Sequence, residues 1–111
     1  MMIFKNIKEA HQKFKFPGSH RIGTVIKNDL AVRVYSNGVI APDYFSKNLK
    51  HFYYFVKNEK ILNAFKNNKL LNKNVYLFVK NLEKGVVIYY GQYKVKGFRK
   101  KNQYVLLEKS I

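Results

Sequence analysis

The sequence predicts an α+β fold that is mainly β, namely a small antiparallel β-barrel with one or two short helices. The stretch from Asn74 to Glu108 holds three runs rich in β-branched and aromatic residues, separated by two short polar breaks. This pattern is typical of consecutive strands joined by hairpin turns. Helical spacing occurs only in two short segments, and no regular alternation of strands and helices is visible. With 111 residues, we expect a single domain over residues 1–111 with one modest core.

The first predicted element is a short helix from Ile7 to Phe14. Asn6 is a candidate N-cap, and Glu9 follows three residues later, which resembles a capping box. The helix is expected to end before Pro17-Gly18. His11 falls on its apolar face, where a packed ring is favoured over a catalytic role.

Short strands follow the helix. Thr24-Val25-Ile26 is a predicted strand, and Leu30 to Tyr35 alternates apolar and other residues, so Arg33 and Tyr35 should share its second face. Ser36-Asn37-Gly38 predicts a tight turn, because Asn-Gly fits the positive φ angles of a hairpin. Val39 to Ala41 would continue as a strand until Pro42, which has no amide donor.

A strand, a helix and a three-stranded ribbon complete the prediction. Phe52 to Val56 is a short aromatic strand, and Asn58 is a candidate N-cap for a helix that buries Ile61, Leu62 and Phe65. In the ribbon, Gly85 suits a turn position with positive φ. Gly91 and Gly97 lie inside a strand, where glycine often marks a bulge or sharp bend.

The charge of the chain points to a polyanionic partner. Twenty-two lysines and arginines face six acids, which gives a formal net charge of +16. Such an excess destabilises the compact state by self-repulsion, so a nucleic acid is a reasonable partner. A lysine- and asparagine-rich composition bias is the alternative explanation, and the two can hold together.

Several classes of protein are disfavoured. The chain has no cysteine, hence neither a disulfide framework nor a thiolate metal site. No run approaches the ~20 apolar residues of a membrane span, and the N-terminus does not resemble a signal peptide. We expect a cytoplasmic protein without metal or cofactor.

The run from Val39 to Glu108 carries a family resemblance. It reads VIAPDYF, then NVYLFVK after a short helix, then VVIYYGQYKV and YVLLEK. It resembles the SRA/PUA-like β-barrel DNA-reading domains of prokaryotic modification-dependent restriction enzymes, through an LFV-type strand and the aromatic-plus-glycine element Tyr89-Tyr90-Gly91. Met1 to Asp29 has no matching motif. The resemblance implies a barrel that grips duplex DNA and inspects a base or a modification, in the SRA branch by flipping the base into an aromatic pocket. A related possibility is the pseudobarrel fold shared by plant transcription factors and some restriction enzymes.

The predicted DNA-binding residues are basic, amide and aromatic side chains. Lysine and arginine neutralise phosphates, arginine and amides can contact base edges, and tyrosine rings can stack on bases. The candidates in the ribbon and its tip are Tyr89, Gln92, Tyr93, Lys94, Lys96, Arg99, Lys100, Lys101, Asn102 and Gln103. We expect Arg33 and Tyr35 to share one concave surface with Tyr93. His20 and Arg21 are further candidates.

These features predict a non-catalytic DNA-binding specificity module of a restriction or defence protein, whose nuclease or motor activity lies in other domains or subunits. An RNA-binding PUA-like module is the first alternative. A small metal-free ribonuclease or toxin that uses His20 or His51 is the second. The spacing of His11, His20 and His51 matches no metal-ligand motif.

Overall fold

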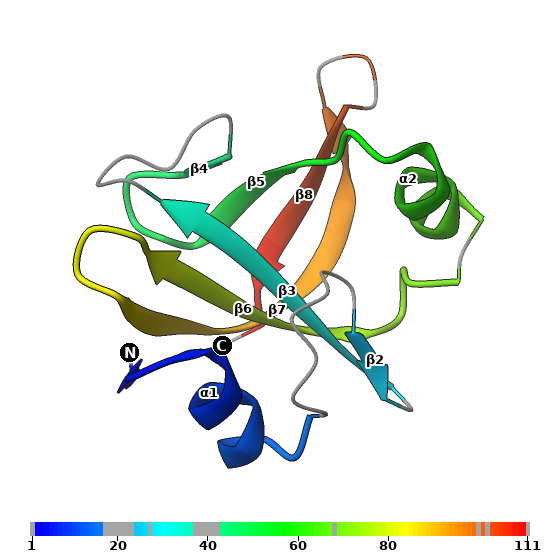
Figure 1. The fold of residues 1–111 in the computed structure, drawn as a ribbon. Helices are drawn as coiled ribbons and strands as arrows, with labels where there is room; N and C mark the ends of the chain where they lie inside the picture. The colour runs from blue at the N-terminus through cyan, green and yellow to red at the C-terminus, as the bar shows by residue number, and fades with distance from the viewer. Residues whose placement is uncertain are drawn as a thin grey trace.

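The architecture is a curved, mostly antiparallel sheet with two short helices (Figure 1). The computed structural model describes residues 2–16, 24–26, 28–36, 43–67, 69–99, 101 and 103–110. The elements, in chain order, are β1 (Met2–Phe4), α1 (Ile7–Lys13), β2 (Thr24–Ile26), β3 (Asp29–Ser36), β4 (Tyr44–Phe45), β5 (His51–Phe55), α2 (Glu59–Lys66), β6 (Asn74–Asn81), β7 (Val86–Arg99) and β8 (Tyr104–Lys109).

The strand order is β2-β3-β6-β7-β8-β5-β4, and β1 pairs with the first half of β7. The expected all-antiparallel arrangement is wrong in one place, because β3 and β6 are parallel. The sheet is therefore mixed. Among the described residues, no pairing joins the end strands β2 and β4, so the sheet does not close into a barrel along this path. Mainly β with two helices is the class that the sequence predicted.

Both helices begin as predicted. The Asn6 side chain accepts a hydrogen bond from the amide of Glu9 at 2.8 Å. Asn58 likewise accepts hydrogen bonds from the amides of Lys60 and Ile61. These amides have no partner within their helix, so each asparagine satisfies donors that the helix leaves open.

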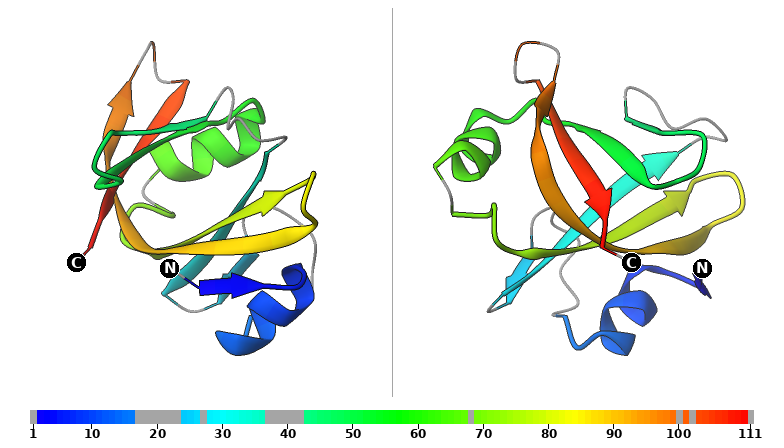
Figure 2. Two further views of the ribbon diagram at one scale, coloured as in Figure 1. Left: turned by 90° about the vertical axis from the view of Figure 1, so that its left-hand side faces the viewer. Right: turned by 180° about the vertical axis from the view of Figure 1, so that it is seen from behind.

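The long strand β7 bends because of two irregularities at the predicted glycines. Its pairing with β6 shifts register between Gly91 and Tyr89, and its pairing with β8 shifts between Val95 and Gly97. Gly91 has φ +118°, a conformation that side chains rarely adopt. Because β7 bends, its first half pairs with β6 and its second half with β8, and the sheet wraps around its core (Figure 2).

The sheet buries side chains on both faces. The main core lies on the concave face, where α2 contributes Phe65; it consists of Leu30, Val32, Val34, Phe52, Tyr54, Val56, Phe65, Val75, Leu77, Val79, Tyr93, Val105 and Leu107. A second cluster lies between α1 and the other face of β3, β6 and β7, and consists of Phe4, Ile7, Ala10, Phe16, Ala31, Phe78, Val87 and Tyr89. His11 belongs to this region as a buried ring, 5.5 Å from the ring of Phe78, which confirms its packing role.

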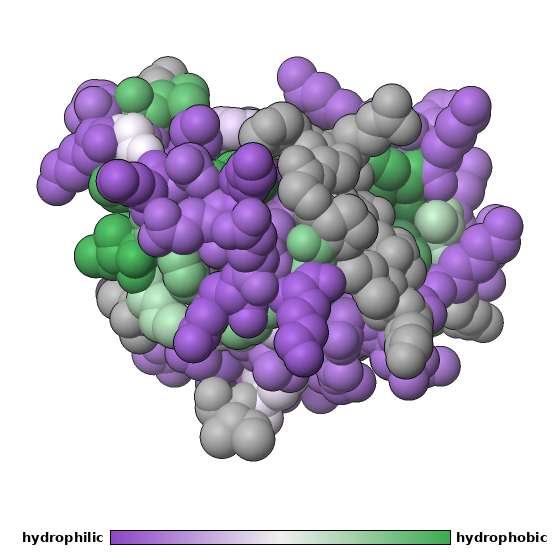
Figure 3. Space-filling model, turned by 60° about the horizontal axis from the view of Figure 1, so that its bottom comes forward, coloured by the Kyte–Doolittle hydropathy of each residue, from purple (hydrophilic) through white to green (hydrophobic). Residues whose placement is uncertain are grey.

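The side on which α1 lies is mostly hydrophilic where its surface is described (Figure 3). The exposed residues of α1 are Lys8, Glu9, Gln12 and Lys13. Met2 and Ile3 of β1 are exposed apolar residues beside them. Neither of the described helices is long and apolar enough to cross a membrane.

Candidate nucleic-acid interface

The basic side chains of β7 lie on its convex face, away from the main core. Lys94, Lys96 and Arg99 are exposed, whereas Val95 and Phe98 pack against the core. Strict alternation would place Phe98 with the lysines and Arg99 with Val95. The extra residue at the second bulge, Lys96, reverses the order beyond it, so Arg99 joins Lys94 on the convex face.

The hairpin that follows carries the same chemistry. Lys101 and Gln103 are exposed between β7 and β8. Lys101 has φ +59°, within the turn. Lys100 and Asn102, the other predicted residues of this tip, lie outside the described residues, as do His20 and Arg21.

One acid lies among these cations. The Glu108 carboxylate is 3.1 Å from His51 Nε2 and 4.0 Å from Lys96 Nζ. The hydrogen bond from His51, and then the nearby lysines, lower the pKa of Glu108. Lys94 lies directly opposite Glu108 in the β7–β8 ladder. The outer row Lys94, Glu108 and His51 therefore crosses three strands.

Two predicted tyrosines are structural instead. Tyr93 is fully buried, and its hydroxyl donates a hydrogen bond to the Leu49 carbonyl at 2.9 Å. Tyr89 packs under α1, with its ring 4.4 Å from that of Phe14. Burial raises the pKa of each to about 12. The prediction that these rings meet DNA is wrong, because both lie within apolar clusters.

The expected shared surface for Arg33 and Tyr93 is also wrong. Arg33 is fully buried and follows Ala31 on the α1 side of β3, whereas Tyr93 belongs to the main core on the other side of the sheet. Burial lowers the pKa of Arg33. Tyr35 lies beside Arg33 and is 42% exposed. Gln92 is exposed next to the bend at Gly91.

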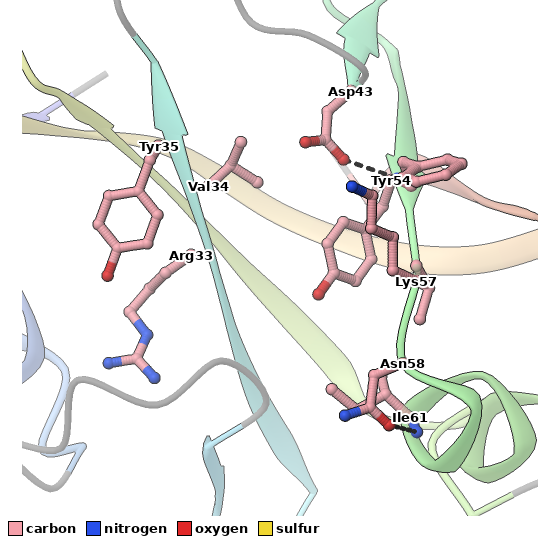
Figure 4. Close-up of a pocket in the computed structure, with 10 residues that line it drawn as sticks. Arg33, Val34, Tyr35, Asp43, Tyr54, Lys57, Asn58 and Ile61 are labelled. Carbon is pink, nitrogen blue, oxygen red and sulfur yellow. Dashed lines mark hydrogen bonds between the residues drawn. The ribbon is translucent and has the colours of Figure 1, made fainter.

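A cavity of about 340 Å³ opens between β3 and β5, near the start of α2 (Figure 4). Its apolar lining includes Val34, Val56 and Ile61. Asp43 and Tyr54 supply polar groups, and Arg33 and Tyr35 lie across β3 from them. Neither Asp43 nor Tyr54 was among the predicted DNA-binding residues, since no local sequence pattern links them.

One of the polar groups of this cavity already takes part in a hydrogen bond within the protein. Asp43 Oδ1 accepts a 2.6 Å hydrogen bond from the Phe55 amide, and burial raises the pKa of Asp43. Burial, followed by the charge of Asp43, raises the pKa of Tyr54. No group of the described residues hydrogen-bonds the Tyr54 hydroxyl, although Tyr54 is only 5% exposed. The cavity thus offers a neutral hydroxyl and a carboxylate to a ligand.

Comparison of the chain with family models, curated proteins and solved structures found no match. Within the described residues, no three histidine, aspartate or glutamate side chains form a metal-binding group.

Proposed function

We propose that the protein is a non-catalytic DNA-binding specificity module of a restriction or defence protein. The observation that carries this proposal is the convex basic surface formed by Lys94, Lys96, Arg99, Lys101 and Gln103. Its cations alternate with core residues along β7, so the sheet presents them together. Glu108 is the one acid paired with them among the described residues.

In this proposal, one surface of the protein provides affinity for DNA and a separate cavity provides specificity. The convex basic surface would contact phosphates and provide most of the affinity. The cavity between β3 and β5 would receive the base or base edge that gives specificity. Its hydroxyl and carboxylate can pair with polar atoms of a base, and its volume lies near the lower end of the range for small-ligand sites, roughly 300–1,000 Å³.

We include the finer fold assignment in the proposal: a PUA/SRA-like sheet or a related pseudobarrel. Its support is the resemblance of the run from Val39 to Glu108, together with the bent strand β7, which two halves of the sheet share. An experimental structure in which β2 and β4 belong to two separate flat sheets would contradict it.

A salt titration tests whether the convex basic surface contacts DNA phosphates. Affinity for duplex DNA should fall by a factor of about 10³ or more between 50 and 200 mM salt if about six phosphates are contacted. Lys94→Ala and Lys101→Ala should each weaken binding to all sequences and lower the salt slope by roughly one. Lys60→Ala, at an exposed position on α2, is the matched control and should leave the slope unchanged. A flat salt response of the unmodified protein would overturn the proposal.

A separate experiment tests the reading site. Tyr54→Phe removes only the hydroxyl and keeps the ring, so it should reduce discrimination between preferred and random duplexes without changing the salt slope. The expected loss is ~1–3 kcal/mol on the preferred site alone. Equal weakening on all duplexes would assign Tyr54 to folding rather than to specificity.

A further inference from the structure

One part of the convex face of the sheet is covered by neither of the helices that the structure describes. Helix α1 covers β3, β6 and the first half of β7, and α2 packs on the concave face. No described helix packs on the convex side of β5, β8 and the second half of β7 (Figure 2). The Lys94, Lys96 and Arg99 side chains belong to this uncovered part.

The uncovered part also carries aromatic rings. Tyr53 and Phe55 of β5 are half-buried and alternate with the core residues Phe52 and Tyr54, so they point to the convex side. Phe55 lies opposite Tyr104 of β8, with 5.2 Å between the ring centroids. Tyr104 is only 9% exposed, so Phe55 is the more accessible ring of this pair.

The strand registers place cations beside these rings. Tyr104 lies opposite Arg99 as well as Phe55. Tyr53 lies opposite Leu106, which in turn lies opposite Gly97. Since neighbouring strands are ~4.8 Å apart and β8 lies between β5 and β7, the backbones of β5 and β7 are about 10 Å apart. Gly97 has no side chain, so only the tip of Arg99 stands near its position, 3.4 Å from where a Cβ would be.

We propose that this convex aromatic and basic surface binds unpaired DNA, with bases stacked on Tyr53 and Phe55 and phosphates on Lys94, Lys96 and Arg99. The inference rests on the proposed function, in which the same cations contact phosphates, and it adds the substrate class. A polyanion complements the charge of the surface, and a polyanion with flat faces also complements its rings. An acidic peptide would complement the cations alone.

The rings distinguish unpaired from paired DNA. In a duplex, both faces of each base are already stacked, so Tyr53 and Phe55 gain nothing from it. An unpaired base can lie on an aromatic side chain, which is worth roughly 1–3 kcal/mol per base. Each ring should therefore raise affinity for single strands alone, by about 5- to 150-fold.

The test compares a labelled oligothymidylate of twelve nucleotides with a duplex of equal length at one fixed salt concentration. Tyr53→Leu and Phe55→Leu keep an apolar side chain and remove the ring. Each should weaken single-strand binding by about tenfold or more and change duplex binding by less than about twofold. Tyr53→Phe should retain single-strand affinity, because it keeps the ring. Leu82→Ala removes an exposed apolar side chain from the turn between β6 and β7, outside this surface and outside the cavity, and should have no effect.

The outcomes separate the inference from the function on which it rests. If the unmodified protein binds neither form, the proposed function fails. If it binds both with a steep salt response while Tyr53→Leu and Phe55→Leu leave single-strand affinity unchanged, the stacking inference alone fails. Equal losses on both forms, with thermal unfolding unchanged, would also overturn it. If a variant has lowered thermal stability, its single-strand affinity is divided by its duplex affinity. This ratio does not change when a fraction of the protein is misfolded, because both affinities are lowered equally.

Discussion

At the scale of the residue, Tyr93 is a test of a core hydrogen bond. Tyr93→Phe removes the bond to the Leu49 carbonyl while keeping the buried ring. We expect the free energy of unfolding to fall by about 0.5–1.5 kcal/mol at neutral pH, with no change in DNA affinity. Urea unfolding and an anisotropy titration measure the two quantities. A loss of affinity with unchanged stability would return Tyr93 to the binding site.

Tyr93→Phe should also change how the stability of the protein depends on pH in the alkaline range. The pKa of Tyr93 is about 12 in the folded protein and 10.0 in its ordinary state. Between these values the unfolded chain releases a proton that the folded protein keeps, so stability falls as the pH rises from 10 to 12. Tyr93→Phe should make this fall shallower, whereas Tyr35→Phe, at an exposed ring, should leave it unchanged.

Asp43 gives a test of the same kind in the acid range, because burial also disfavours its charged form. Its folded pKa is raised above the ordinary 3.8, so stability falls as the pH rises through that raised pKa. Asp43→Asn keeps an acceptor for the Phe55 amide and should flatten this acid-range dependence. Asp43→Ala leaves the part-buried amide without its acceptor and should cost ~1–3 kcal/mol. Equal stability of the two variants in urea would contradict the role of the hydrogen bond.

At the scale of the element, the bend in β7 depends on Gly91. Its φ of +118° strains any side chain, and a Cβ would lie 3.2 Å from Lys109 Cε. Gly91→Ala should therefore destabilise the protein by about 1 kcal/mol or more, mainly through the backbone. Gly97→Ala is the matched control, because its φ lies outside the positive region and its nearest neighbour is the movable tip of Arg99. Urea midpoints measure both, and equal midpoints would show that the bend tolerates a side chain.

The elements that local patterns specify were predictable. Asn6 and Asn58 mark helix starts, Gly85 adopts φ +68° in its turn, and both strand glycines lie at register shifts. The three-residue strand β1 was missed, since it is too short to show a period of two. The short strand β4 was missed for the same reason.

The faces of the side chains beyond a bulge could not be predicted. Tyr89 and Tyr93 are four residues apart and would share a face in a regular strand. The extra residue near Gly91 turns them to opposite faces, so one packs under α1 and the other in the main core. The sequence marks a bulge with glycine, but it does not state which residue is left unpaired. Lys94 and Lys96 are nevertheless both exposed, although Lys96 is itself the unpaired residue of the second bulge.

At the scale of the whole molecule, the pairing between strands that are distant in the sequence was the feature least predictable from the sequence. The parallel pairing of β3 with β6 joins residues that are more than forty positions apart in the sequence, and no local pattern predicts it. The same distance hid the cavity, because Asp43, Tyr54 and Val34 meet only when β3 and β5 are placed. The basic surface was more predictable, since its cations belong to a single ribbon.

The last prediction concerns catalysis by the whole molecule. The two histidines in the described part of the chain differ in exposure to solvent. His11 is fully buried, whereas His51 is partly exposed on the convex face and paired with Glu108. A general acid and base must reach the reacting atoms, so His51 and Glu108 are the pair in the described residues that an RNase-like reaction could use. The groove beside Glu108 has a volume of about 420 Å³ and is lined by Lys94, Lys96 and Lys109, but His51 is not among its lining residues, so the two members of the pair do not face one nucleotide-sized site together.

We therefore expect the protein to bind nucleic acid without cutting it. Labelled duplex DNA, single-stranded DNA and RNA should remain intact over hours, with magnesium and with a chelator. Cleavage of RNA that disappears in both His51→Ala and Glu108→Gln, with unchanged unfolding curves, would establish the ribonuclease alternative. Cleavage that persists in both variants but disappears in His20→Ala would assign the ribonuclease alternative to His20, whereas cleavage that persists in all three variants would indicate a contaminating nuclease. Gln92→Ala is the matched control on the same convex region, and it should leave both integrity and folding unchanged.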